Sequence, residues 1–254
     1  MIGVFDSGVG GLTVVKEIRK KLPDVSILYL GDTAHLPYGN KSPEAITNFS
    51  LRNTRFLIER GAEMVVIACH SSASVATEEL RRRFSLPILT VVEAGAKAVA
   101  KKRPEKVGVI GTIATIESGS YINQLRKEGV KGEIIARACP LMVSLVEEGI
   151  LEGRVAEVVV DHYLSQFRSE GIDILLLGCT HFPMLIPVME KILPGVELID
   201  PGQVVADELS KQSSFQGDGR LVVYLTDLSY GFRSVAERFL GEEVGEIVRI
   251  TLEE

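Results

Sequence analysis

The chain of 254 residues contains no tryptophan and only three cysteines, Cys69, Cys139 and Cys179. A small, odd number of cysteines does not fit a disulfide framework and favours a reducing compartment. No apolar stretch approaches the roughly 20 residues that a membrane-spanning helix needs. The sequence opens on a predicted strand, where a signal peptide would have a basic segment. We therefore expect a cytoplasmic protein without a membrane partner.

Positive charge is also scarce. The 28 lysines and arginines are outnumbered by 34 aspartates and glutamates, which gives a net charge of −6, and no long basic run is present. Nucleic-acid-binding proteins usually carry a basic patch, so we expect no nucleic acid partner. Since 46% of the residues are hydrophobic, the chain can bury a full core, as one large domain or two small ones.

The sequence does have a regular alternation of short apolar runs and amphipathic segments. Strands are predicted near 2–5, 27–30, 64–68, 88–92, 107–112, 133–137, 173–177, 196–199 and 221–225. Helices are predicted near 12–21, 43–60, 73–84, 118–128, 141–149, 153–169 and 184–193. Such alternation is typical of α/β folds with mostly parallel sheets.

The second half of the chain restarts the pattern of the first. Residues 107–112 (VGVIGT) resemble residues 2–7 (IGVFDS). We therefore predict two similar, pseudo-duplicated α/β domains with the active site in the cleft between them. Residues 1–96 together with 207–254 form the first, discontinuous domain, and 97–206 form the second.

Two cysteines end apolar runs in matching positions of these halves. Cys69 follows residues 64–68, and Cys179 follows residues 174–178. Open α/β sheets place reactive groups at such strand ends, and a helix beginning there lowers the pKa of a thiol. A pair of thiols facing a ligand from both sides could remove a proton from one face and return one to the other. Cys139, before Pro140, better fits an inert buried thiol.

Zinc binding is the alternative for these segments, because Cys69-His70 and Cys179-Thr180-His181 contain two thiols and two imidazoles. Structural zinc sites usually pair their ligands as C-x₂₋₄-C, and adjacent ligands have awkward geometry. We therefore expect no metal.

Two loops follow the first two predicted strands. The glycine-rich loop 6–13 could bind a nucleotide, pack a helix on a strand, or hold a small carboxylate. Thr13 replaces the third glycine of a dinucleotide motif, which weakens the first interpretation. The loop 31–40 is either a surface loop or part of the same cleft.

Six motifs in order carry a resemblance over almost the whole chain: FDSGVGGLTV from Phe5, GDTAHLPYG from Gly31, AC at 68–69, GVIGTIAT from Gly108, ACPLMVSLVEEG from Ala138 and LGCTHFP from Leu177. Together they resemble the glutamate racemase family of the cofactor-independent aspartate/glutamate racemases. The resemblance implies two α/β domains, a glutamate substrate, no cofactor and a homodimer. It also implies racemisation of L- and D-glutamate that supplies D-glutamate for peptidoglycan.

The resemblance further implies roles for individual residues. Cys69 and Cys179 would be the catalytic acid and base, assisted by Asp6 and His181, with Glu147 a further catalytic candidate. Substrate contacts would come from Asp6, Ser7, Tyr38, Gly39, His70, Ser71, Thr112, Thr115, Thr180 and His181. Three alternatives stay open: racemisation of aspartate or another acidic amino acid, a catalytically weak protein that binds an acidic amino acid, and a nucleotide-dependent oxidoreductase.

One position departs from the family. His70-Ser71 stands where the family usually has Asn-Thr, so an imidazole replaces a smaller, neutral amide. A charged imidazole would stabilise the Cys69 thiolate and weaken it as a base, whereas a neutral one would alter the pocket by its bulk. Both routes predict that His70→Asn raises kcat/KM for glutamate.

Overall fold

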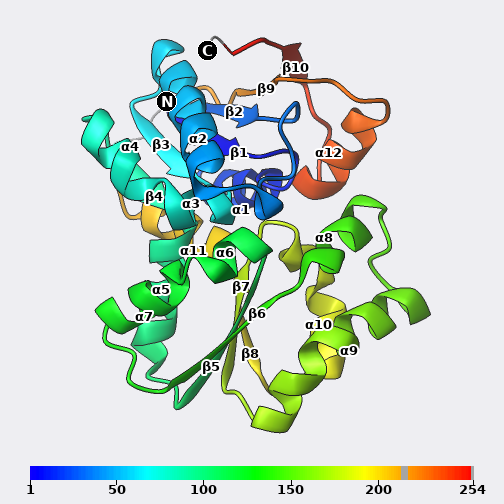
Figure 1. The fold of residues 1–254 in the computed structure, drawn as a ribbon. Helices are drawn as coiled ribbons and strands as arrows, with labels where there is room; N and C mark the ends of the chain where they lie inside the picture. Colours follow the sequence, from blue (N-terminus) through cyan, green and yellow to red (C-terminus); the bar gives the residue numbers. More distant parts are fainter. Residues whose placement is uncertain (213–216, 253–254) are drawn as a thin grey trace.

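Two parallel sheets form the framework of the molecule (Figure 1). The computed structural model of the chain describes residues 1–212 and 217–252. The first sheet has the order β10-β9-β2-β1-β3-β4, with β1 (Ile2–Asp6), β2 (Ile27–Gly31), β3 (Met64–Ile67), β4 (Ile88–Thr90), β9 (Leu221–Leu225) and β10 (Glu246–Arg249). The second has the order β6-β5-β7-β8, with β5 (Lys106–Gly111), β6 (Glu133–Ala138), β7 (Ile174–Gly178) and β8 (Glu197–Ile199).

The two sheets repeat one topology. The order β2-β1-β3-β4 in the first sheet matches β6-β5-β7-β8 in the second, and all the strand pairs are parallel. Strands β9 and β10 extend the first sheet beyond β2. The prediction of two similar α/β units with parallel sheets is therefore confirmed, and residues after the second unit do return to the first.

The central strands form because their residues are almost continuously apolar. Every residue of β1, β2, β3 and β7 is buried. Strands covered by helices on both faces of a parallel sheet need no polar alternation, so such runs are their normal signature. The strand ends are thereby fixed in a rigid core.

The helices cover these sheets (Figure 1). They are α1 (Leu12–Lys21), α2 (Pro43–Glu59), α3 (His70–Val75), α4 (Thr77–Arg83), α5 (Val91–Lys102), α6 (Ile113–Glu117), α7 (Ser120–Lys127), α8 (Pro140–Glu147), α9 (Gly153–Glu170), α10 (Ile186–Ile192), α11 (Pro201–Ser210) and α12 (Phe232–Leu240), with 3₁₀ turns η1 (Tyr38–Asn40) and η2 (Phe182–Leu185). Side-chain caps define several starts: Ser42 accepts from Ala45 N, and Thr90 accepts from Glu93 N. Thr112 caps α6 by accepting from Thr115 N.

The structure differs from the expected elements in a few places. The helix expected over 73–84 begins at His70 and divides into α3 and α4 at Ala76, between the β-branched Val75 and Thr77. Helices α5, α6, α11 and α12 and strand β10 were not predicted. The predicted domain boundaries at 96/97 and 206/207 fall inside α5 and α11, so their placement stays a prediction. None of the helices in residues 1–212 and 217–252 is long and apolar enough to cross a membrane.

Candidate active site

A cavity of about 240 Å³ lies where the two halves meet. This volume is below the roughly 300–1,000 Å³ of drug-sized ligand pockets, so it suits a small molecule. The cavity is lined by Asp6, Ser7, Gly8, Leu36, Pro37, Tyr38, Gly39, Asn40, Cys69, His70, Ser71, Thr112, Ile113, Pro140, Val143, Ser144, Glu147, Cys179, Thr180 and His181.

The sheet topology explains why these residues meet. In each sheet the strand order reverses beside the first strand of the unit, between β1 and β3 and between β5 and β7. Asp6 ends β1 and Cys69 follows β3, while Thr112 follows β5 and Cys179 follows β7. Ligands of open α/β sheets bind at such reversal points, outside the carboxyl ends of the strands. Here two reversal points share one cavity.

The thiol of Cys69 is buried, with 4% of the residue exposed, directly before α3. Burial and the negative charge of Asp6 raise the pKa of Cys69 to about 12, against smaller opposing effects of hydrogen bonds with Ser72 and Ser7. The helix that follows predicts a lowered pKa instead. For Cys69 that prediction is wrong, because desolvation of the thiolate outweighs the helix terminus.

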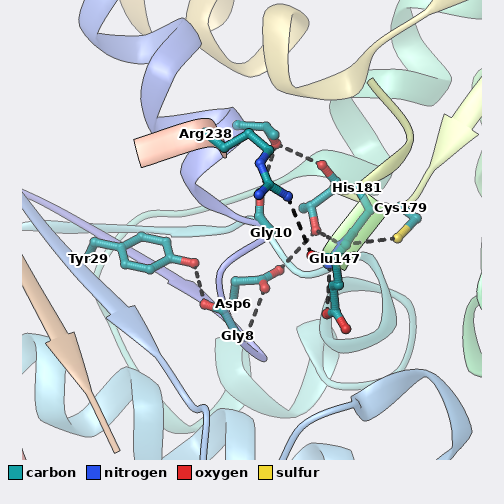
Figure 2. A network of polar contacts seen from close by, with 10 residues as sticks. Asp6, Gly8, Gly10, Tyr29, Glu147, Cys179, His181 and Arg238 are labelled. Atoms are coloured by element: carbon teal, nitrogen blue, oxygen red, sulfur yellow. Dashed lines mark hydrogen bonds and ion pairs between the residues drawn. The ribbon is translucent and has the colours of Figure 1, made fainter. Parts of the chain in front are cut away.

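Asp6 lies beside this thiol and is 1% exposed. Gly8 N donates to its Oδ1 at 2.9 Å, and Thr180 Oγ1 donates to its Oδ2 at 3.4 Å (Figure 2). Burial raises the pKa of Asp6, while the charge of His181 and these hydrogen bonds act in the opposite direction. The carboxylate therefore lies between the Cys69 and His181 sides of the cavity.

Cys179 has different neighbours. Its Sγ lies 3.8 Å from His181 Nδ1, and His181 Nε2 lies 3.1 Å from Glu147 Oε1 (Figure 2). Burial opposes a charge on His181, but its hydrogen bonds with Cys179 and Glu147 raise the pKa of His181 to about 10. A protonated imidazole therefore stands between the sulfur and the carboxylate at neutral pH.

Helix α12, which follows the last predicted strand, also packs around this imidazole. Phe239 of α12 is fully buried and packs edge-on against His181, with the ring centroids 5.1 Å apart. Arg238 Nη1 reaches the carbonyl oxygen of Glu147 at 3.5 Å (Figure 2). Neither residue was predicted, although the apolar spacing of Phe232, Val235, Ala236 and Phe239 is a helical signal that would have found α12.

The glycine-rich loop packs against the Cys179 loop. A Cβ at Gly10 would lie 2.3 Å from Thr180 Oγ1 and 2.6 Å from His181 Cε1, so only glycine allows this approach. Thr13 Oγ1 also donates to Thr180 O at 2.9 Å. The packing interpretation of this loop is therefore confirmed, and Asp6, Ser7 and Gly8 also line the cavity, while binding of a nucleotide or a carboxylate stays a prediction.

The 31–40 loop lines the cavity through Leu36, Pro37, Tyr38, Gly39 and Asn40. Buried Asp32 anchors it, accepting a hydrogen bond from Tyr38 Oη and lying 2.8 Å from His35 Nδ1. Asn53 Nδ2 in turn donates to Tyr38 Oη at 3.2 Å. The loop is thus held at the cleft, not on the outer surface.

His70 and Ser71 join the two halves beside the cavity. His70 Nδ1 lies 2.8 Å from Tyr121 Oη, and Ser71 Oγ lies 2.9 Å from Thr112 Oγ1. Burial lowers the pKa of His70 to about 3, so its imidazole is neutral. Of the two routes considered for this residue, only the neutral one remains.

All the predicted site residues except Thr115 line the cavity. Thr115 is 1% exposed and lies behind Thr112, with the two hydroxyl oxygens 3.0 Å apart. The cavity residues not predicted individually, such as Asn40 and Ser144, belong to motifs quoted for the resemblance or adjoin them. Cys139 is fully buried, bonds to the carbonyl oxygen of Arg137 at 3.6 Å and does not line the cavity.

The cavity lining contains no lysine or arginine, and its titratable residues are Asp6, Tyr38, Glu147, the two cysteines and the two histidines. Throughout residues 1–212 and 217–252, no group of three or more His, Cys, Asp or Glu side chains is placed to hold a metal ion.

The chain is similar to known racemases over nearly its full length. Residues 7–209 match the Asp/Glu/Hydantoin racemase family. Glutamate racemase of Aquifex aeolicus (strain VF5) is 44% identical over 96% of this chain and 95% of its own, and that of Geobacter metallireducens is 43% identical over 99% and 97%. The structure of glutamate racemase from Francisella tularensis in complex with D-glutamate is 36% identical and superimposes with a TM-score of 0.93, covering 99% of this chain and 97% of that one.

Proposed function

The chain belongs to the Asp/Glu/Hydantoin racemase family and is an amino acid racemase, an isomerase, and we propose that it interconverts L- and D-glutamate without a cofactor by means of Cys69 and Cys179. The observation that carries this proposal is the shared cavity. Two thiols from equivalent strand ends, one in each half, line it together.

The proposed reaction needs one base and one acid at the α-carbon. A thiolate of one cysteine takes the α-proton, so an S–H bond forms as the C–H bond breaks and the electron pair stays on carbon. The thiol of the other cysteine then gives its proton to the opposite face of that carbon. The two cysteines end with exchanged protonation states, which suits a reversible reaction.

The surroundings of the two sulfurs support such a division. Cys69 is held as a thiol by burial and by Asp6, which equips it to donate a proton. The imidazolium of His181 places a positive charge 3.8 Å from the Cys179 sulfur, which stabilises negative charge there. Glu147 holds the far side of the same imidazole. The resting site therefore suits the direction of the reaction in which Cys179 takes the α-proton as a thiolate and Cys69 donates a proton as a thiol.

The substrate would be held mostly by neutral donors. Hydroxyls of Ser7, Ser71, Thr112 and Thr180 line the cavity beside backbone amides of its loops. Such fixed donors stabilise negative charge that develops on the α-carboxylate in the transition state. Asp6 supplies the negative charge that the α-ammonium group requires. His181 is the one positively charged side chain of the lining at neutral pH.

The relatives extend the proposal beyond the reaction. Both relatives are glutamate racemases, and this chain matches 95% or more of the length of each. We propose the same substrate here, with D-glutamate supplied in the cytoplasm for peptidoglycan synthesis by a homodimer.

The test is incubation of the protein with L-Glu, D-Glu, L-Asp and D-Asp separately, without added cofactor, followed by chiral chromatography. We expect both glutamate enantiomers to converge on equal amounts, with deuterium entering Cα in heavy water. Faster conversion of aspartate than of glutamate would mean that aspartate is the preferred substrate. Binding of glutamate without deuterium exchange would instead identify an acidic amino acid binding protein.

A further inference from the structure

The hydrogen bond between His70 and Tyr121 crosses from one half of the molecule to the other. His70 is the first residue of α3, directly after Cys69, and Tyr121 lies in α7 of the second half. They are 4% and 2% exposed, and their contact is 2.8 Å long. Both groups are neutral, because burial lowers the pKa of His70 to about 3 and raises that of Tyr121 well above its usual value.

Tyr121 also touches the segment that carries the other cysteine. A Cβ at Gly178 would lie 3.1 Å from Tyr121 Cε2, so the aromatic ring packs directly on the backbone before Cys179. Gly178 is in turn held in β7 beside Gly111 of β5. A short chain of contacts therefore runs from Cys69 through His70 and Tyr121 to Gly178 and Cys179.

We propose that His70 and Tyr121 form a bridge that sets the separation of the Cys69 and Cys179 sulfurs, so that Tyr121 is a positioning residue. This role presupposes the two-cysteine racemisation proposed above. Tyr121 does not line the cavity, so it acts through the segments that it joins. Two sulfurs that exchange protons with one carbon atom from opposite faces must stay at a defined separation, because proton transfer requires close, aligned contact.

The bridge uses Nδ1, and this explains how different residues can serve at position 70. Nδ1 is bonded to Cγ, as are the amide oxygen and nitrogen of asparagine. Asparagine at this position can therefore place a hydrogen-bonding atom where Nδ1 lies. Leucine fills similar space and offers no such atom, so it removes the bridge while leaving a side chain of comparable volume.

A double-mutant cycle tests the bridge, because two residues that act through one contact give non-additive effects. The variants are Tyr121→Phe, His70→Leu, His70→Asn and the combinations of Tyr121→Phe with each. We expect Tyr121→Phe to lower kcat about tenfold while KM stays within about twofold. In the His70→Leu background the same change should have almost no further effect, whereas in the His70→Asn background it should again lower kcat about tenfold.

A second measurement separates positioning from a general loss of structure. In heavy water, a carbanion that is poorly placed for the second thiol is reprotonated by the first, and it receives deuterium with retention once that thiol has exchanged its proton with the solvent. The ratio of deuterium exchange with retention to inversion should therefore rise about threefold or more in Tyr121→Phe. A merely destabilised enzyme would lose exchange and inversion in proportion. The matched controls are Tyr224→Phe in β9, where the ring packs on Phe56, and His162→Asn on the exposed face of α9.

Each outcome has one meaning. Additive effects of Tyr121→Phe and His70→Leu, or an unchanged exchange ratio in Tyr121→Phe, would overturn the bridge while the wild-type enzyme still racemises glutamate. Absence of α-proton exchange in the wild-type protein would instead overturn the proposed function. Folding of every variant is checked by circular dichroism, and if His70→Leu fails to fold, the exchange ratio of Tyr121→Phe decides, since an unchanged ratio overturns the bridge.

Discussion

Cys69 and Cys179 follow the third strand of their respective halves, β3 and β7, but they meet different neighbours. Cys69 is buried beside the carboxylate of Asp6, which disfavours a second negative charge. Cys179 lies next to an imidazole held in its protonated form by Glu147. Repetition of the fold has thus provided two equivalent positions, and their different neighbours, Asp6 for Cys69 and His181 with Glu147 for Cys179, make them chemically unlike. A reaction that needs an acid and a base at one carbon requires both features.

The largest effect is expected from removing either sulfur. Cys69→Ser and Cys179→Ser should each lower glutamate racemisation by about 10³-fold or more, because a serine hydroxyl is far too weakly acidic to replace a thiol near neutral pH. Chiral chromatography measures the loss, and circular dichroism checks that the fold is kept. If one variant keeps a tenth or more of the activity, the two positions are not partners in the reaction.

Cys139→Ser is the matched control for these variants. Its thiol is buried outside the cavity, so we expect turnover to change less than about twofold. A large loss from a folded Cys139→Ser protein would place a third thiol in the mechanism.

His181→Gln should remove the positive charge that distinguishes the Cys179 side. We expect kcat to fall about 10²-fold, within the range for a lost acid/base contribution. Deuterium exchange with retention should also slow more for one glutamate enantiomer than for the other, since only one of the two thiols loses its neighbour. His162→Gln, on the exposed part of α9, provides the control. Equal slowing for both enantiomers would mean that His181 serves the two sulfurs alike.

The same imidazole should make stability depend on pH. The pKa of His181 rises from 6.5 to about 10 on folding, so its contribution is fully present below pH 6.5 and is lost as the pH rises through about 10. We expect the wild-type free energy of unfolding to lose about 5 kcal/mol more over this interval than that of His181→Gln, since each pKa unit corresponds to about 1.4 kcal/mol. Denaturant unfolding at several pH values measures the difference, and parallel curves for the two proteins would contradict it.

The smallest effect is expected at His70, where the chain departs from its family. Because the imidazole is neutral, its bulk and not its charge distinguishes it from asparagine. His70→Asn should raise kcat/KM for glutamate roughly tenfold, about 1.4 kcal/mol, and the gain should appear in KM, with kcat nearly unchanged. Measuring aspartate in parallel shows whether the residue affects substrate choice. A fall in glutamate activity would identify the histidine as an adapted part of the site.

The central fold could be predicted because its pattern is local. Apolar runs such as 174–178 are readable in sequence, and strand ends follow from them within a residue or two. The prediction missed α12 and β10, where the described chain is more polar and only partly buried. The helices α5, α6 and α11 were missed as well. It also divided the chain within α5 and α11, since helices that lie between two sheets give no signal of which one they belong to.

The members of the site could be predicted, but their charges could not. Motifs place Cys69 and Cys179 at strand ends, and a helix terminus then suggests an acidic thiol. The raised pKa of Cys69 depends instead on complete burial and on Asp6, which is 63 positions earlier in sequence. The partner of His70 is likewise Tyr121, which lies outside the six motifs, and burial of the imidazole, which the motifs do not reveal, lowers its pKa to about 3.

The return of the chain to the first sheet also has a consequence for biosynthesis. Strand β9 adds to the free edge of β2, and α12 brings Phe239 against His181. A nascent chain therefore exposes the edge of β2, a site for unwanted strand pairing, until β9 has been synthesised. The second sheet, whose strands span 106–199, can assemble earlier. We expect activity to emerge only after β9 and α12 have left the ribosome and joined the first half.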